Sequence, residues 1–172
     1  MKGIGFRSSP SAVTYAVVEG HRDSYKILAL EKLAVPQALQ PPNQLHFVRT
    51  VLLDVMEDFG VTRAGLRVPE SVALKTILAR TYIEGVIQEL LASSNVERYF
   101  TGQKSTLAAL LGISDRNQIT RWIDGLESPP FSSEWVSFAA DEREAVLTAC
   151  ASVAGSPDEF TTAALTGVRG RK

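Results

Sequence analysis

The first third of the chain alternates apolar and polar positions in a way that predicts three strands. Ile4 and Phe6 alternate with glycines, residues 14–18 form a short β-branched and aromatic run, and residues 25–33 follow a polar loop. Period-two alternation with β-branched and aromatic residues is typical of strands. Consecutive strands joined by short loops are expected to pair antiparallel, so this third predicts a β-meander.

The rest of the chain predicts helices that alternate with short strands. After a proline-rich linker, apolar residues recur at steps of three and four, which predicts a helix from an N-cap at Asn43 to a stop at Gly60. It is followed by a strand over 62–70, a helix over 74–91 and a strand over 95–102. Three further helices are predicted over 104–111, from a cap at Ser114 to 126, and over 139–153.

This order of elements predicts the class of fold. Three antiparallel strands followed by alternating helices and strands indicate an α/β fold, with a mixed sheet of antiparallel and parallel strands and helices on both faces. We expect one domain over residues 1–155 and a C-terminal tail over 156–172, partly disordered, because its end is basic and contains glycine. With 45% apolar and 22% charged residues, the chain has the composition of a globular protein with a real core.

Composition and missing motifs exclude several kinds of chemistry. The net charge of −1 means that any nucleic-acid surface must be a local patch. Cys150 is the one cysteine, so an internal disulfide and a cysteine-built zinc site are excluded, and we expect it in the core. His21 and His46 lack ligand spacing, and no dinucleotide, P-loop or nucleophile-elbow motif is found. We see neither a membrane-spanning run nor a signal peptide, and expect a cytoplasmic protein without a membrane partner.

Two stretches in the first half of the chain resemble one family of nucleases. "GFRSSPSAVTYAVV" resembles the opening hairpin of the RNase H-like fold in length and in its pattern of residue types. It is most similar to the hairpin of the RuvC-type Holliday-junction resolvases. Members of that family have an aspartate at the end of the first strand, where this chain has Arg7. "PESV" supplies Glu70 where the family has a glutamate after its fourth strand, although an ungapped match places Arg67 there.

Two stretches in the second half extend the resemblance. "TGQKSTLAALLGISDRNQITRWIDGL" is similar to a family segment whose basic residues face DNA, and Lys104 and Arg116 fall on those positions. "FAADEREAVLTACA" is similar to the family's final helix, which begins with two acidic residues three apart, as Asp141 and Glu144 are here. Such an acidic pair is also a favourable interaction with the helix dipole, which is the alternative interpretation.

The resemblance implies a degenerate catalytic site made of Glu70, Asp141 and Glu144, with Arg7 at the position of the lost aspartate. Cleavage of this type uses two divalent ions held by several carboxylates, and Mg²⁺ requires hard oxygen ligands. An arginine offers donors and a fixed positive charge, so it cannot be a ligand. We therefore expect no cofactor, and an ion pair between Arg7 and Asp141 or Glu70. The alternative for Arg7 is a solvated turn residue without acidic neighbours.

Three functions follow as hypotheses. The first is a catalytically inactive RuvC-like domain that binds nucleic acid, with DNA favoured, or a DNA-processing protein; the resemblance to the resolvases also suggests a homodimer. The second is an active Mg²⁺-dependent endonuclease, with Glu70, Asp141 and Glu144 as metal ligands, and the third is a protein-interaction scaffold. Inactivity is favoured over activity because of Arg7. The resemblance implies a groove for nucleic acid lined by basic residues, namely Arg63, Arg67, Lys75, Arg80, Lys104, Arg116 and Arg121.

Overall fold

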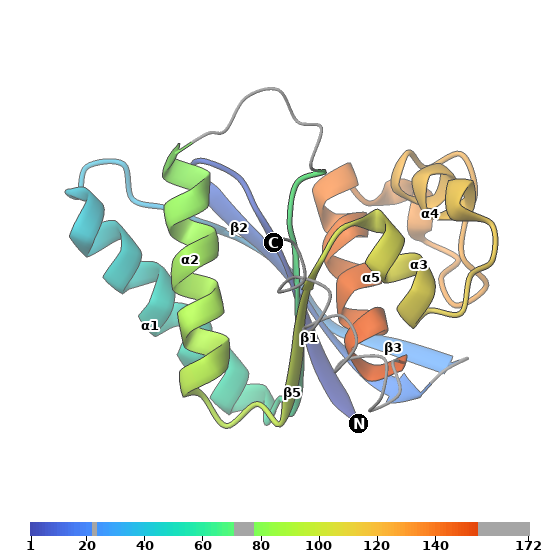
Figure 1. Cartoon of the computed structure of the whole chain (residues 1–172), viewed down its shortest axis with the longest axis horizontal. Coiled ribbons are helices and arrows are strands. Elements are labelled where there is room, and N and C mark those ends of the chain that lie inside the picture. Colours follow the sequence, from blue (N-terminus) through green and yellow to red (C-terminus); the bar gives the residue numbers. More distant parts are fainter. Residues whose placement is uncertain (22–23, 71–77, 155–172) are drawn as a thin grey trace, which may run out of the picture.

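The computed structural model describes residues 1–21, 24–70 and 78–154, and arranges them in three layers (Figure 1). A five-stranded sheet with the order β3-β2-β1-β4-β5 forms the middle layer. The first three strands pair antiparallel, and the last two join β1 in parallel, so the predicted α/β fold with a mixed sheet is confirmed. The strands are β1 (Lys2–Ser8), β2 (Ala12–His21), β3 (Ser24–Ala34), β4 (Arg63–Arg67) and β5 (Arg98–Gly102).

Helices cover both faces of this sheet, as the sequence predicts (Figure 1). On one face, α1 (Pro41–Phe59) and α2 (Leu78–Ser93) bury an apolar cluster that includes Phe6 and Leu52. On the other face, a second cluster that includes Trp135 and Leu147 is formed by α3 (Lys104–Leu110), α4 (Arg116–Ile123), the short η1 (Trp135–Ser137) and α5 (Ala140–Ala154).

Two predicted helix starts are wrong, one by three residues and one by a single residue. Helix α1 begins at Pro41 rather than after Asn43, because a proline in the first turn has no N–H that would need a partner inside the helix. Helix α4 is capped by Asp115 rather than Ser114, and the Asp115 side chain accepts a hydrogen bond from the backbone N–H of Asn117. Both corrections leave the apolar face of the helix, and therefore the layer it belongs to, unchanged.

Several smaller predictions concern the cysteine, the two histidines, the C-terminal tail and the membrane. Cys150 is fully buried in α5, as expected, and burial raises the pKa of its thiol. His21 and His46 are both exposed. The predicted tail over 156–172 and its boundary lie outside the described residues. Within the described part of the chain, none of the helices combines the length and the apolar character needed to cross a bilayer.

The close approach of α5 to β1 depends on a glycine. Strand β1 turns glycines toward α5 and large apolar side chains toward α1 and α2. A Cβ added at Gly5 would lie 2.2 Å from the backbone nitrogen of Ala149 and 2.3 Å from the carbonyl oxygen of Ala145. Helix backbone therefore lies directly against strand backbone. Arg7, two residues further along the same face, is thereby brought within reach of α5.

This packing predicts a strong effect of a single methyl group. We expect Gly5→Ala to lower the free energy of unfolding by about 3 kcal/mol, because the new Cβ meets helix backbone that cannot move alone. Gly85→Ala is the matched control, since Gly85 is an exposed position of α2 with nothing within 4 Å of an added Cβ. It should stabilise the protein by up to about 1 kcal/mol. Urea unfolding of both variants measures the difference, and similar values would contradict the close contact.

Candidate functional site

One row of polar residues crosses the sheet on the face that α5 covers. In the strand pairing, Lys32 of β3, Thr14 of β2, Arg7 of β1 and Arg67 of β4 are consecutive partners. Side chains of residues that are partners across strands point to the same face of a sheet. The row therefore presents three cations and one hydroxyl group to α5, although its members come from four different strands.

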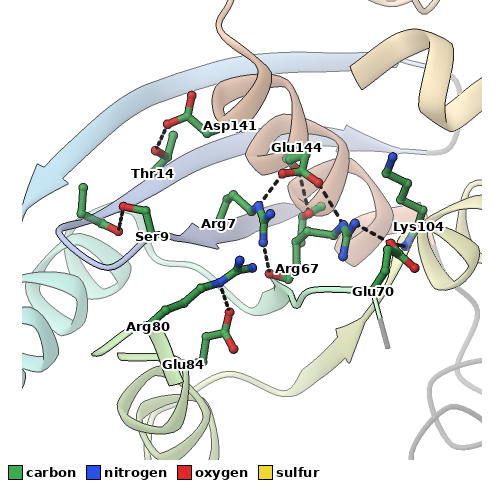
Figure 2. Close-up of polar contacts among 12 residues, drawn as sticks. Arg7, Ser9, Thr14, Arg67, Glu70, Arg80, Glu84, Lys104, Asp141 and Glu144 are labelled. Carbon is green, nitrogen blue, oxygen red and sulfur yellow. Dashed lines mark hydrogen bonds and ion pairs between the residues drawn. The ribbon is translucent and has the colours of Figure 1, made fainter. Parts of the chain in front are cut away.

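Helix α5 supplies two carboxylates to this row, one helical turn apart. Glu144 lies between two guanidinium groups: Arg7 Nε donates to its Oε2, and Arg67 Nε lies 3.2 Å from its Oε1 (Figure 2). Asp141 lies further toward β3, and its Oδ2 accepts from Thr14 Oγ1 and from Lys32 Nζ, each at 2.8 Å. Glu144 thus lies against two cations of the row and Asp141 against one.

A third carboxylate joins the row beyond β4. Arg67 Nη2 donates to Glu70 Oε1 at 2.6 Å, and the backbone N–H of Lys104 donates to the same oxygen at 3.2 Å (Figure 2). Because Arg67 is only 2% exposed and contacts both Glu70 and Glu144, it acts as a buried bridge between the two acids.

The predicted partner of Arg7 is wrong. We expected Asp141 or Glu70, and the structure pairs Arg7 with Glu144. The reason is the position of α5 over the sheet, which places the turn with Glu144 above β1 and β4 and the preceding turn with Asp141 above β2 and β3. The three acids therefore do not meet at one point, as the resemblance implied, but are spread along the row.

The charges of this network are held in place by its contacts. Burial lowers the pKa of Arg7, the charge of Glu144 raises it, and the positive charges of Arg80 and Arg67 lower it again. The net decrease starts from a very high value, so the guanidinium stays protonated. Burial raises the pKa of Asp141, but hydrogen bonds from Lys32 and Thr14 outweigh this and lower it overall.

The arrangement does not fit the magnesium ions that the resemblance implies. Mg²⁺ needs carboxylate oxygens that can converge on it, and each of Glu70, Asp141 and Glu144 is instead bound by a cation of the protein. The guanidinium groups of Arg7 and Arg67 lie against both oxygens of Glu144. Among residues 1–21, 24–70 and 78–154, no three His, Cys, Asp or Glu side chains are grouped so that they could hold a metal ion.

The basic residues predicted to line a groove have different surroundings. Arg67 does not lie on the surface as expected, because it is buried beneath Glu70 and Glu144. Lys104 is half-buried at the start of α3, and its Nζ lies 3.5 Å from Thr120 Oγ1 on α4. The side chain of Arg121 is 35% exposed, but Asp115 and Glu127 already bind it.

The remaining members of the predicted basic set are less informative about a groove. Arg63 is at the opposite end of β4 and lies 3.5 Å from a carboxylate oxygen of Glu97. Arg80 lies on α2, where its Nε donates to Glu84 at 2.8 Å. Lys75 lies outside the described residues, and so does the side chain of Arg116, whose backbone begins α4.

The sequence reasoning missed Thr14 and Lys32 as partners of Asp141. A signal for both was available in the hairpin. Arg7 and Thr14 are equally far from the centre of the turn that joins β1 to β2, so they must be opposite one another once the hairpin closes. The same counting across the next hairpin leads from Thr14 to Lys32 only after the irregularity between Val17 and Val18 is known.

The fold is that of RuvC-type Holliday junction resolvases, which have the RNase H-like architecture. The chain is similar to Thermus thermophilus RuvC solved with a Holliday junction substrate, with a TM-score of 0.64, 12% identity, and coverage of 88% of this chain and 92% of that one. A second structure of T. thermophilus RuvC gives a TM-score of 0.62 and 14% identity, with the same coverage. The yeast mitochondrial Holliday junction resolvase gives 0.52 and 17%, covering 88% of this chain and 77% of that one. No family model matches the sequence, and no curated protein matches it.

The buried network makes a prediction about stability. We expect Arg7→Met to lower the free energy of unfolding by about 3 kcal/mol, because Glu144 would keep a buried charge with one cation fewer. Combining it with Glu144→Gln should recover about 1 kcal/mol or more of this loss, since the uncompensated charge is then removed.

Arg49→Met is the matched control for this experiment. Arg49 of α1 forms a more exposed pair with Glu89 of α2, at 2.8 Å, and exposed pairs contribute about 0–1 kcal/mol. Denaturant unfolding of the three variants measures the comparison. If Arg7→Met were no more costly than Arg49→Met, the pair with Glu144 would not be the buried interaction described above.

Proposed function

We propose that this chain is an RNase H-like domain that binds nucleic acid, with DNA favoured, and does not cut it. The observation that carries the proposal is the contact of Arg7 with Glu144, because it puts a permanent cation of the protein against a carboxylate that a metal-dependent site would need. By its resemblance to the resolvases, Arg7 stands at the position of a metal-binding aspartate. A guanidinium there repels divalent ions and cannot bind them.

An active Mg²⁺-dependent endonuclease is the less favoured alternative. It would require Glu70, Asp141 and Glu144 to leave their present partners and converge on metal ions. Glu144 alone would have to give up contacts with both Arg7 and Arg67. Breaking buried charge contacts of this kind is costly, so the observed arrangement favours the inactive form.

Binding of nucleic acid does not need the lost metal ligand. Contacts with phosphate require only lysine, arginine and backbone donors. The contact between Lys104 and Thr120 puts the start of α3 beside α4, so Lys104, Arg116 and Arg121 belong to neighbouring helices on one face of the sheet. We take these three residues, together with Lys75, as the proposed nucleic-acid contacts.

A protein-interaction scaffold is the second candidate, and one surface feature favours it. Leu78 and Tyr82, at the start of α2, are large apolar residues that are exposed. They border a groove whose other walls include Pro10, Pro41 and Leu45. A DNA-processing protein or a second copy of this chain, which would give the homodimer, are the partners proposed for such a surface.

The proposal predicts binding without cleavage. We expect the full chain to leave a labelled four-way junction, single-stranded DNA and single-stranded RNA intact in Mg²⁺ or Mn²⁺. In fluorescence anisotropy, log affinity should fall linearly with log salt concentration, by about 0.9 for each phosphate contacted on the duplex arms of the junction and by about 0.7 on a single strand. Lys104→Gln should reduce this slope by about 1. Lys26→Gln should leave it unchanged, because Lys26 is an exposed residue at the opposite end of the sheet.

Each outcome of this experiment separates the candidates. Metal-dependent cutting that is lost in Glu144→Gln would establish the endonuclease and refute the inactive domain. Intact substrates with no salt-dependent binding to any of the three would refute nucleic-acid binding and leave the scaffold.

A further inference from the structure

Three arginines gather at the end of the sheet, where β1 and β4 finish side by side. Arg7 and Arg67 are opposite one another on these two strands, and Arg80 approaches from α2 (Figure 2). Figure 2 shows the guanidinium of Arg80 directed toward that of Arg7. The positive charges of Arg80 and Arg67 both lower the pKa of Arg7, in keeping with the position of Arg7 between them.

The acceptors around these arginines do not satisfy all of their donors. Glu144, Glu84 and Glu70 each take part, and the carbonyl oxygen of Arg67 accepts from Arg7 Nη1 at 3.4 Å. Arg67 Nε, Arg67 Nη1 and Arg80 Nη2 are nevertheless buried without a hydrogen-bond partner among the described residues, although Arg67 Nε lies 3.2 Å from Glu144 Oε1. Buried donors without an acceptor are costly, so a cluster that keeps three of them is suited to receive an acceptor from outside.

We propose that Arg7, Arg67 and Arg80 form a binding site for a phosphate group. The planar fork of a guanidinium matches the spacing of phosphate oxygens and can donate to two of them at once. Donors that arrive from β1, β4 and α2 need an acceptor with oxygens on several sides. A tetrahedral phosphate provides this, whereas a flat carboxylate has two oxygens in one plane.

The burial of the three side chains suits such a site. Arg67 is 2% exposed and lies on the buried side of the cluster, whereas the side chains of Arg7 and Arg80 are 19% and 17% exposed and are therefore partly accessible from solvent. The site lies beyond the carboxyl ends of two parallel strands, between helices on opposite faces, which is where ligands bind in many open α/β sheets.

The glutamates of the cluster determine how strongly the binding of phosphate should depend on salt. Glu70, Glu84 and Glu144 already balance the three positive charges, so directed hydrogen bonds rather than net charge must carry the affinity. Binding of phosphate here should therefore depend less on salt than binding of a nucleic-acid backbone to surface lysines. A terminal phosphate with three free oxygens fits better than a phosphodiester with two.

The site is independent of the proposed function, because free phosphate can occupy it without nucleic acid. The first experiment uses inorganic phosphate and the full chain. We expect sodium phosphate to raise the melting temperature more than sodium chloride of equal ionic strength, and titration calorimetry to give a saturable heat. Arg80→Gln should weaken the affinity at least tenfold, while glutamine keeps a donor for Glu84. Arg80→Lys should also weaken it, because it keeps the charge but loses the fork.

Arg49→Gln is the control, since it removes an arginine from a glutamate pair of α1 and α2 that lies outside this cluster. Phosphate stabilises many proteins without binding to them, so the difference between Arg80→Gln and Arg49→Gln decides the matter. The site is refuted if both variants respond to phosphate like the unchanged chain, or if Arg49→Gln loses as much affinity as Arg80→Gln.

A second experiment identifies the source of the phosphate. Oligonucleotides of one sequence are compared with a 5′-phosphate and with a 5′-hydroxyl. If the phosphorylated form binds more tightly and inorganic phosphate removes only that advantage, the site receives a nucleic-acid end. If the two forms bind equally while Arg80 still governs the response to inorganic phosphate, the site receives a free phosphate. Both results support the site, and loss of the 5′-phosphate advantage in Arg49→Gln but not in Arg80→Gln would overturn it.

Discussion

The carboxylate of Glu144 is the group on which this end of the molecule depends. It is almost completely buried, and it is shared by Arg7 and Arg67 from two adjacent parallel strands. A buried carboxylate with one cation removed is strongly unfavourable, so the helix and both strands are held to one relative position. Arg67 extends the same constraint to Glu70, whose oxygen in turn accepts the backbone N–H at the start of α3. One acid therefore organises contacts among four elements.

The architecture could be predicted from the sequence because its local patterns agree with one another. Alternation identifies the strands of the meander, and three- and four-residue spacing identifies α1. The order of elements, and from it the mixed sheet, could therefore be predicted. The helix starts were less predictable. Pro41 begins α1 although prolines usually interrupt helices, and whether a proline lies inside the first turn or before it depends on contacts that the local pattern does not contain.

The contacts among the polar residues at this end of the sheet were less predictable than the fold, and Thr14 and Lys32 were not expected among them. The spacing of Asp141 and Glu144 put both on one side of α5, which is correct. Which strand each of them meets depends on how far α5 slides along the sheet, and one helical turn of about 5.4 Å is enough to exchange partners. Local periodicity carries no information about that distance. Arg67 was wrongly expected on the surface for a similar reason. An arginine in a short strand is usually exposed, and the local sequence does not show that a helix with an acidic residue covers it.

The two faces of strand β1 carry different kinds of side chain, and this difference affects how the chain reaches the native register of its strands. Ile4 and Phe6 fill the cluster beneath α1 and α2, whereas Arg7 faces α5. If β1 paired with its neighbours one residue out of register, the Arg7 guanidinium would point into that apolar cluster. Glu144 would then face a phenyl ring or a small hydroxyl group instead of a cation. A hairpin in the wrong register is therefore destabilised twice, once by the buried guanidinium and once by the carboxylate without its cation. The charge cluster thus favours the native register of the sheet, whatever ligand the folded domain binds.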